Sequence, residues 1–70
     1  MAHATIRAVT AKNIAQLIID KYSVDENTAL QMFYESGIGE AFADDETGLY
    51  GQSALYIFNL FNEEYKNVYS

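Results

Sequence analysis

Residues 53–69 read SALYIFNLFNEEYKNVY, and this stretch decides the fold that the sequence predicts. Its apolar side chains recur at intervals of three and four residues, which is the spacing of one face of an α-helix. Ser53 is a suitable N-cap, because its hydroxyl oxygen can accept a hydrogen bond from a free amide of the first turn. We therefore predict a central helix here, against which the earlier parts of the chain pack. Its apolar face consists of Ala54, Phe58, Phe61, Tyr65 and Val68, with Ile57 and Tyr69 beside it and Leu55 at its edge.

A second helical stripe lies at residues 11–22. The spacing of its apolar side chains predicts a helix, with Thr10 as a candidate N-cap. Ile6 and Val9 do not share this face, so residues 1–9 are either a flexible arm or the beginning of the same helix. The single helical domain then comprises residues 10–70. The stripe comprises Ala11, Ile14, Ala15, Ile18 and Tyr22, widened by Leu17 and Ile19.

A third helix is predicted to follow a break at residues 21–26 and to run to about residue 36. Two N-caps fit its beginning, and both stay open at this point: Ser23 with Glu26 as a capping box, or Asp25 with Val24 as the preceding hydrophobic residue. Gly37 is well placed as a left-handed C-terminal cap. The predicted buried face of this helix consists of Ala29, Leu30, Phe33 and Tyr34.

The region between the third predicted helix and the central helix contains only short apolar patterns. Ile38, Ala41 and Phe42 are spaced for one additional helical turn at residues 38–43. A loop with two glycines follows, and we expect its apolar residues Leu49 and Tyr50 to fold back onto the core. The predicted fold is therefore all-α, a small three-helix bundle or orthogonal array.

The composition indicates one small domain that is stabilised by packing alone. The chain has 70 residues, is 50% hydrophobic, and contains six Tyr, four Phe, no Cys and no Pro. It has no disulfide and no thiolate metal site, so its stability must come from aliphatic and aromatic packing or from a partner chain. The sequence has no long apolar run typical of a signal peptide or a membrane span, and we expect a cytoplasmic protein that binds no membrane.

The charges are segregated along the chain. The net charge is −6, and no basic residue occurs between Lys21 and Lys66, whereas nine acidic residues do. The remaining basic residues are Arg7 and Lys12. Such a surface repels phosphate backbones, so we expect no nucleic-acid partner. A solvated surface that keeps a small protein soluble is the simplest interpretation.

No pattern of catalytic, cofactor-binding or metal-binding residues is present. The acidic run at residues 44–46 does not fit a calcium loop, because a loop that begins at Asp44 has Gly48 at the fifth ligand position and no acid at the twelfth. His3 is the only histidine, and one histidine cannot form a structural zinc site. Glu63 and Glu64 point about 100° apart on a helix and are interpreted as a hydrophilic face. We therefore expect no enzyme and no cofactor.

One feature points to a protein partner. Residues 54–61 are apolar at every position except 59, so this helix is apolar nearly all round. Such a helix is usually buried on more than one side, and 70 residues offer little protein to cover a second side. Leu55, Tyr56 and Leu60 are the candidate interaction residues of this second side. In the alternative interpretation, the loop around Leu49 and Tyr50 folds over them.

Several short motifs combine caps, core positions and a turn: KYSVDE at residues 21–26, AL at 29–30, FYxS at 33–36, DETGLY at 45–50 and SxxY at 53–56. In these motifs the chain resembles small uncharacterised bacterial all-helical proteins classed as domains of unknown function. The resemblance covers residues 11–64. It implies a compact helical domain from a bacterium, and no activity, cofactor or catalytic residue.

These observations favour a non-enzymatic protein–protein interaction module that self-associates as a homodimer through its C-terminal helix. The alternative is an acidic regulator or inhibitor of a basic protein, acting as a nucleic-acid mimic or in an antitoxin-like role, with electrostatics setting the encounter rate. A helical DNA-binding domain that uses Arg7, Lys12 and Lys21 is a further alternative, disfavoured by the excess of acidic residues.

Overall fold

A computed structural model of the chain describes the backbone of residues 2–69 and the side chains of residues 5–67. Its elements in chain order are the α-helices α1 (Ala2–Tyr22), α2 (Glu26–Glu35) and α3 (Gly37–Ala43), the short 3₁₀ helices η1 (Asp45–Thr47) and η2 (Leu49–Gly51), and α4 (Ala54–Tyr69). The part of the chain described is all-α, as the sequence predicts. None of these helices is long and apolar enough to cross a membrane.

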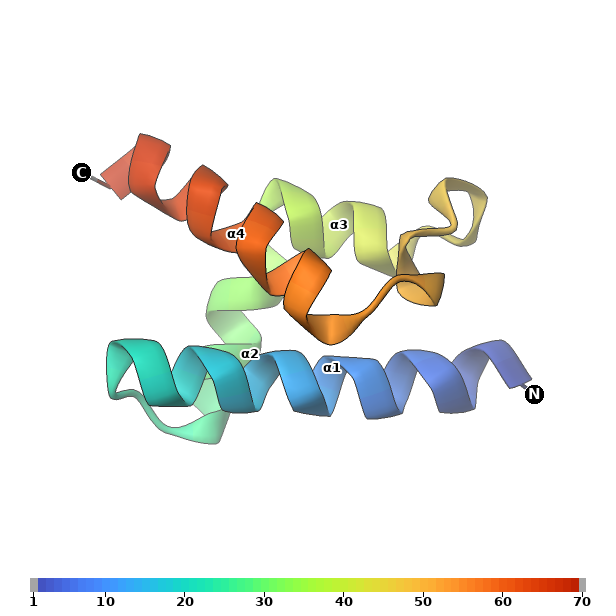
Figure 1. Cartoon of the computed structure of the whole chain (residues 1–70), viewed down its shortest axis with the longest axis horizontal. Helices are drawn as coiled ribbons and strands as arrows, with labels where there is room; N and C mark the ends of the chain where they lie inside the picture. Colours follow the sequence, from blue (N-terminus) through green and yellow to red (C-terminus); the bar gives the residue numbers. More distant parts are fainter. Residues whose placement is uncertain (1, 70) are drawn as a thin grey trace.

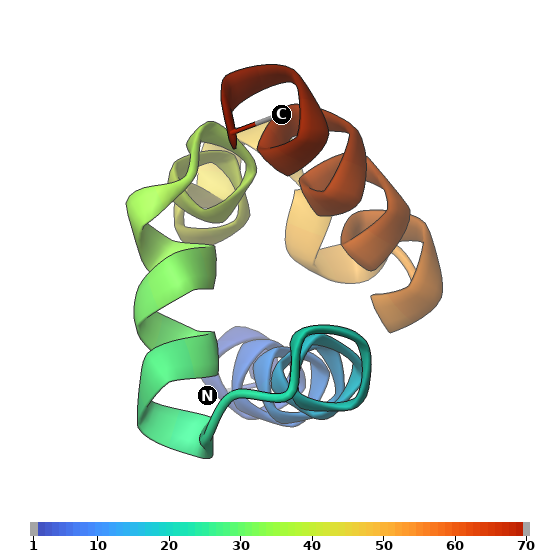
Figure 2. The same cartoon turned by 90° about the vertical axis from the view of Figure 1, so that its left-hand side faces the viewer.

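The four α-helices surround one core. α1 runs along one side of the molecule, α2 rises from its C-terminal end to α3, and α4 crosses obliquely over α1 beside α3 (Figure 1). Seen along α1, α2 and α4 lie on opposite sides of the molecule (Figure 2). The molecule extends over 36 × 21 × 17 Å. The additional turn predicted at residues 38–43 is a separate helix in the structure, α3.

α1 begins well before the predicted start. It already contains residues 2–9, which are the beginning of the helix and not a flexible arm, and Thr10 lies inside it and is not its N-cap. The physical reason is that residues 2–10 include three alanines, the strongest helix former, and no glycine or proline that would end a helix. Ile6 and Val9 are exposed, as their different position around the helix predicts.

α2 begins at Asp25. An Asp25 carboxylate oxygen accepts a hydrogen bond from the Thr28 amide at 2.8 Å, which decides between the two predicted caps. Ser23 instead follows the end of α1 in a left-handed conformation, with φ of 56°, and its amide donates to the Ile19 carbonyl. Tyr34 was predicted to face the core and is 43% exposed, because it lies about 100° around the helix from buried Phe33.

The prediction of a left-handed cap at Gly37 is wrong. Ser36 ends α2 with ordinary extended backbone angles, and Gly37 is the first residue of α3. Ser36 makes this turn possible because its hydroxyl donates to the Phe33 carbonyl at 2.5 Å and accepts from the Gly39 amide at 2.9 Å. One serine therefore serves the last turn of α2 and the first turn of α3.

α3 lies directly against the end of α2 at Gly39. A Cβ atom added there would lie 1.8 Å from the Phe33 carbonyl oxygen and 2.9 Å from the Tyr34 Cα atom. Only glycine allows two backbones to approach this closely. Gly39 therefore sets the distance between α2 and α3.

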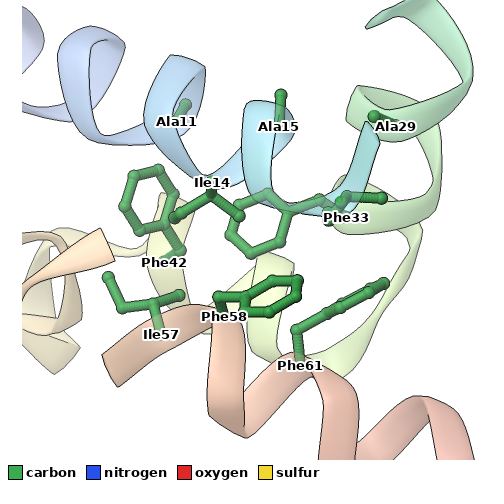
Figure 3. Close-up of a cluster of buried hydrophobic side chains, with 10 residues drawn as sticks. Ala11, Ile14, Ala15, Ala29, Phe33, Phe42, Ile57, Phe58 and Phe61 are labelled. Atoms are coloured by element: carbon green, nitrogen blue, oxygen red, sulfur yellow. The ribbon is translucent and has the colours of Figure 1, made fainter. Parts of the chain in front are cut away.

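The core is aromatic and draws on all four α-helices. Phe33 reaches from α2 into the space between Ile14 of α1 and Phe58 of α4, with Phe42 and Phe61 on either side (Figure 3). Its ring centroid lies 5.3 Å from that of Phe42 and 6.2 Å from that of Phe61. Burying one such side chain contributes about 1.5–3 kcal/mol. The buried set is Ala11, Ile14, Ala15, Ile18, Ala29, Phe33, Phe42, Ile57, Phe58 and Phe61.

The segment of residues 44–53, here called the 3₁₀ loop, closes one end of the core. Leu49 and Tyr50 pack against the core cluster, so this prediction is confirmed. Arg7 of α1 holds the loop through an ion pair with Asp45 and through its guanidinium group, which lies 5.0 Å from the centroid of the Tyr50 ring. The loop thereby connects the N-terminal half of α1 to the beginning of α4.

Candidate interaction surface

α4 begins at a well-defined cap. The Tyr56 amide donates to the Ser53 hydroxyl at 3.1 Å, as the sequence predicts. The inner face of the helix then buries Ile57, Phe58 and Phe61 in the core. This packing fixes the rotation of α4 about its axis and therefore decides which of its other apolar residues face outward.

Two of the three residues predicted as interaction residues face outward. Leu55 is 59% exposed and Tyr56 is 51% exposed, whereas Leu60 is half-buried. Tyr56 and Leu60 lie one turn apart on the side of α4 opposite Phe58. We call Leu55, Tyr56 and Leu60 the outer α4 patch. Tyr56 presents an apolar ring with a polar tip, a combination that is enriched at protein interfaces.

The 3₁₀ loop leaves Leu55 and Tyr56 exposed. Leu49 and Tyr50 pack against the core cluster, and both Leu55 and Tyr56 remain more than half exposed. The alternative in which the loop folds over Leu55, Tyr56 and Leu60 is therefore not met at Leu55 and Tyr56, while Leu60 is half-buried. The reason is that η2, which contains Leu49 and Tyr50, packs against α1 and α3.

The patch lies within an uncharged part of the chain. No Asp, Glu, Lys or Arg occurs in residues 47–62, although 20% of the whole chain is charged. This uncharged segment comprises the end of the 3₁₀ loop and the first half of α4. Charged residues are depleted at the centre of protein interfaces, and this segment contributes none of its own.

Polar contacts anchor the second half of α4. The Glu64 carboxylate accepts hydrogen bonds from the Gly37 amide at 2.7 Å and the Ile38 amide at 3.0 Å. These are free amides at the positive end of the α3 dipole, so a carboxylate stabilises them. The interpretation of Glu64 as part of a solvated face is therefore wrong, whereas Glu63 is exposed. Sequence reasoning missed this contact because its partners lie 26 and 27 residues earlier.

Tyr22 links α4 to α1. Its hydroxyl donates to the Asn62 side-chain oxygen at 2.6 Å, and its ring centroid lies 5.0 Å from that of Tyr65. Burial, and secondly the neighbouring Tyr65, raise the pKa of the Tyr22 hydroxyl above its ordinary value. The neutral phenol is therefore the form that the folded protein favours.

The acidic residues of the 3₁₀ loop are used within the loop. The Asp44 carboxylate accepts from the Glu46 amide at 2.9 Å, and Asp45 pairs with Arg7. Among the described residues, no group of three or more His, Asp or Glu side chains is placed to hold a metal ion. The side chain of His3 lies outside the described residues.

A scan against protein-family models, a search of curated proteins and a search of solved structures each found no match. The resemblance to small bacterial helical proteins of unknown function therefore stays a prediction.

Proposed function

We propose that this protein is a non-enzymatic protein–protein interaction module that binds its partner through the outer α4 patch. The observation that carries the proposal is the exposure of two large apolar side chains, Leu55 and Tyr56, next to one another in an uncharged segment. Exposed apolar patches on small soluble proteins mark interaction sites, which is the basis of the proposal.

The rigidity of α4 adds support. The helix is held by Phe58 and Phe61 in the core and by the contacts of Asn62 and Glu64 with α1 and α3. A surface that is already ordered loses little conformational entropy on binding, which improves affinity for a given area. The outer α4 patch offers a partner apolar contact area and one phenol hydroxyl for a hydrogen bond.

A photo-reactive amino acid at position 56 tests this proposal in the cells that produce the protein. We expect covalent adducts with a protein on irradiation, because the side chain at this position lies in the interface. The matched control carries the same amino acid at position 13, an exposed α1 position outside the patch. An absence of adducts from position 56, or equal adducts from both positions, would refute the proposal.

An acidic regulator of a basic protein is a second candidate. Nine of the ten acidic side chains are exposed, all except half-buried Glu64. A basic partner would then contact these acids, and its binding would weaken steeply as salt screens the charges. A photo-reactive group at Glu40, on the exposed side of α3, reports this mode. Adducts at position 40 with none at position 56 would favour it.

A further inference from the structure

We propose that the 3₁₀ loop is a strap that opens as a unit while the four α-helices stay packed, and that Arg7 holds this strap closed. The inference goes beyond the proposed function, since it concerns a second state of the fold and not the outer α4 patch. The loop closes the end of the core that lies beside the N-terminal half of α1 (Figure 1). Its opening therefore uncovers apolar side chains that the closed fold buries.

The 3₁₀ loop is attached to the core by few buried side chains. Eight of its ten residues are exposed, and only Leu49 and Tyr50 are half-buried. In contrast, the first half of α4 buries Ile57, Phe58 and Phe61. Segments with few buried apolar contacts open locally at a lower free energy than the core. We therefore expect the loop to open without unfolding of the helices.

The backbone hydrogen bonds of η2 join residues that are close in the chain. The Gly51 amide donates to the Gly48 carbonyl at 3.1 Å, and the Gln52 amide donates to the Leu49 carbonyl at 2.9 Å. Bonds of this kind move with the loop when it swings away from α1. A Cβ atom added at Gly48 or Gly51 meets no described atom within 4 Å, so the backbone at both glycines has space to rotate.

Arg7 holds the loop at two points. Its guanidinium group pairs with Asp45 and lies 5.0 Å from the centroid of the Tyr50 ring. The side chains of Arg7 and Asp45 are 24% and 67% exposed, so solvent screens their attraction. Within residues 5–67 the buried Arg7 Nε has no hydrogen-bond partner, which offsets part of the gain from closure. The closed state is therefore favoured by a small margin.

Opening of the strap exposes one edge of the aromatic core. η2 packs against α1 and α3, and Phe42 of α3 is fully buried at the end of the core beside the loop (Figure 3). Removal of Leu49 and Tyr50 from this edge leaves the Phe42 side of the core open to solvent. The strap thus controls access to apolar surface that is separate from the outer α4 patch.

Limited cleavage by chymotrypsin tests the inference on the whole chain, because this protease cuts after Leu49 and Tyr50 once the loop is free. At low protease concentration the rate of the first cut follows the open population. Loss of the ion pair and the cation–π contact in Arg7→Gln should raise this rate about fivefold to tenfold. Lys12→Gln removes the same charge from an exposed position of α1 and should stay within about twofold of the parent. Intact-mass spectrometry identifies the first cut.

A second pair of variants tests the same contact from the loop. Asp45→Asn should accelerate the first cut, whereas Glu46→Gln, the same change at the neighbouring exposed acid, should not. Arg7→Gln combined with Asp45→Asn should accelerate the cut by less than the product of the two single effects, because both remove one interaction. Far-ultraviolet circular dichroism confirms that each variant is folded.

The site of the first cut separates local opening from global unfolding. Phe58 lies in the core, so cleavage there requires unfolding of α4. We expect Arg7→Gln to accelerate the cut in the loop and to leave the rate at Phe58 nearly unchanged. An equal acceleration at both sites, or equal loop cleavage in Arg7→Gln and Lys12→Gln, would overturn the inference. These results do not involve position 56, so the proposed function is tested separately.

Discussion

Replacement of Gly39 by alanine should destabilise this protein far more than an alanine usually does in a helix. The added Cβ would lie 1.8 Å from the Phe33 carbonyl oxygen and 2.7 Å from the Phe33 carbonyl carbon. Both atoms belong to the backbone of α2, so no side-chain rotation relieves the clash. Since contacts below 3.0 Å are essentially never seen for a Cβ atom, the two helices must separate by more than 1 Å.

The magnitude follows from three contributions. Overpacking of this kind costs about 1–3 kcal/mol. Separation of the helices also strains the Ser36 hydroxyl bonds to the Phe33 carbonyl and the Gly39 amide, each contributing about 1 kcal/mol. The higher helix propensity of alanine offsets about 1 kcal/mol of this loss in the free energy of unfolding. We expect a net loss of about 2–4 kcal/mol, against a total stability of about 4–10 kcal/mol for 70 residues.

Urea unfolding monitored by circular dichroism measures this loss, and a thermal scan should show a Tm lower by about 10–20 °C. Gly51→Ala is the matched control. Gly51 is exposed, no atom lies within 4 Å of its added Cβ, and its φ lies outside the left-handed region. The control should stay within about 0.5 kcal/mol of the parent. If Gly39→Ala is as stable as this control, the backbones of α2 and α3 do not approach one another as closely as described.

Three further predictions concern helix ends. Ser23→Gly should raise the free energy of unfolding by up to about 1 kcal/mol, because glycine adopts the φ of 56° without a Cβ clash; a lower Tm than the parent's would contradict this. Glu64→Gln should cost about 1 kcal/mol in urea unfolding, since it removes the charge that caps α3, whereas an equal effect of Glu63→Gln would show that only net charge matters. Hydrogen bonds from Thr28 lower the pKa of Asp25, so the stability that the Asp25 carboxylate contributes is present above its ordinary pKa near 4 and is lost as the pH falls through the lower, folded-state value. Asp25→Ala should therefore reduce the loss of stability on acid titration. Parallel curves of stability against pH for the variant and the parent would argue against this contribution.

Local interactions explain which elements could be predicted. The three- and four-residue spacing around Phe58 and Phe33 predicts α4 and α2, because a helix repeats every 3.6 residues wherever it packs. Asp25 and Ser53 cap amides only three residues ahead, so their roles follow from short sequence windows. Leu55, Tyr56 and Leu60 were proposed from the same periodicity, since they lie outside the main apolar stripe of the helix.

Contacts between distant parts of the chain explain what the sequence left undecided. Glu64 caps α3 across 26 and 27 residues, and Gly39 touches the backbone of Phe33 only because Ser36 turns the chain sharply. The exposure of Leu55 and Tyr56, with Leu49 and Tyr50 directed inward, depends on how α1 and α3 surround the loop. The sequence by itself therefore determined the helices and most of the core through periodicity, and the tertiary packing decided which apolar side of α4 faces outward.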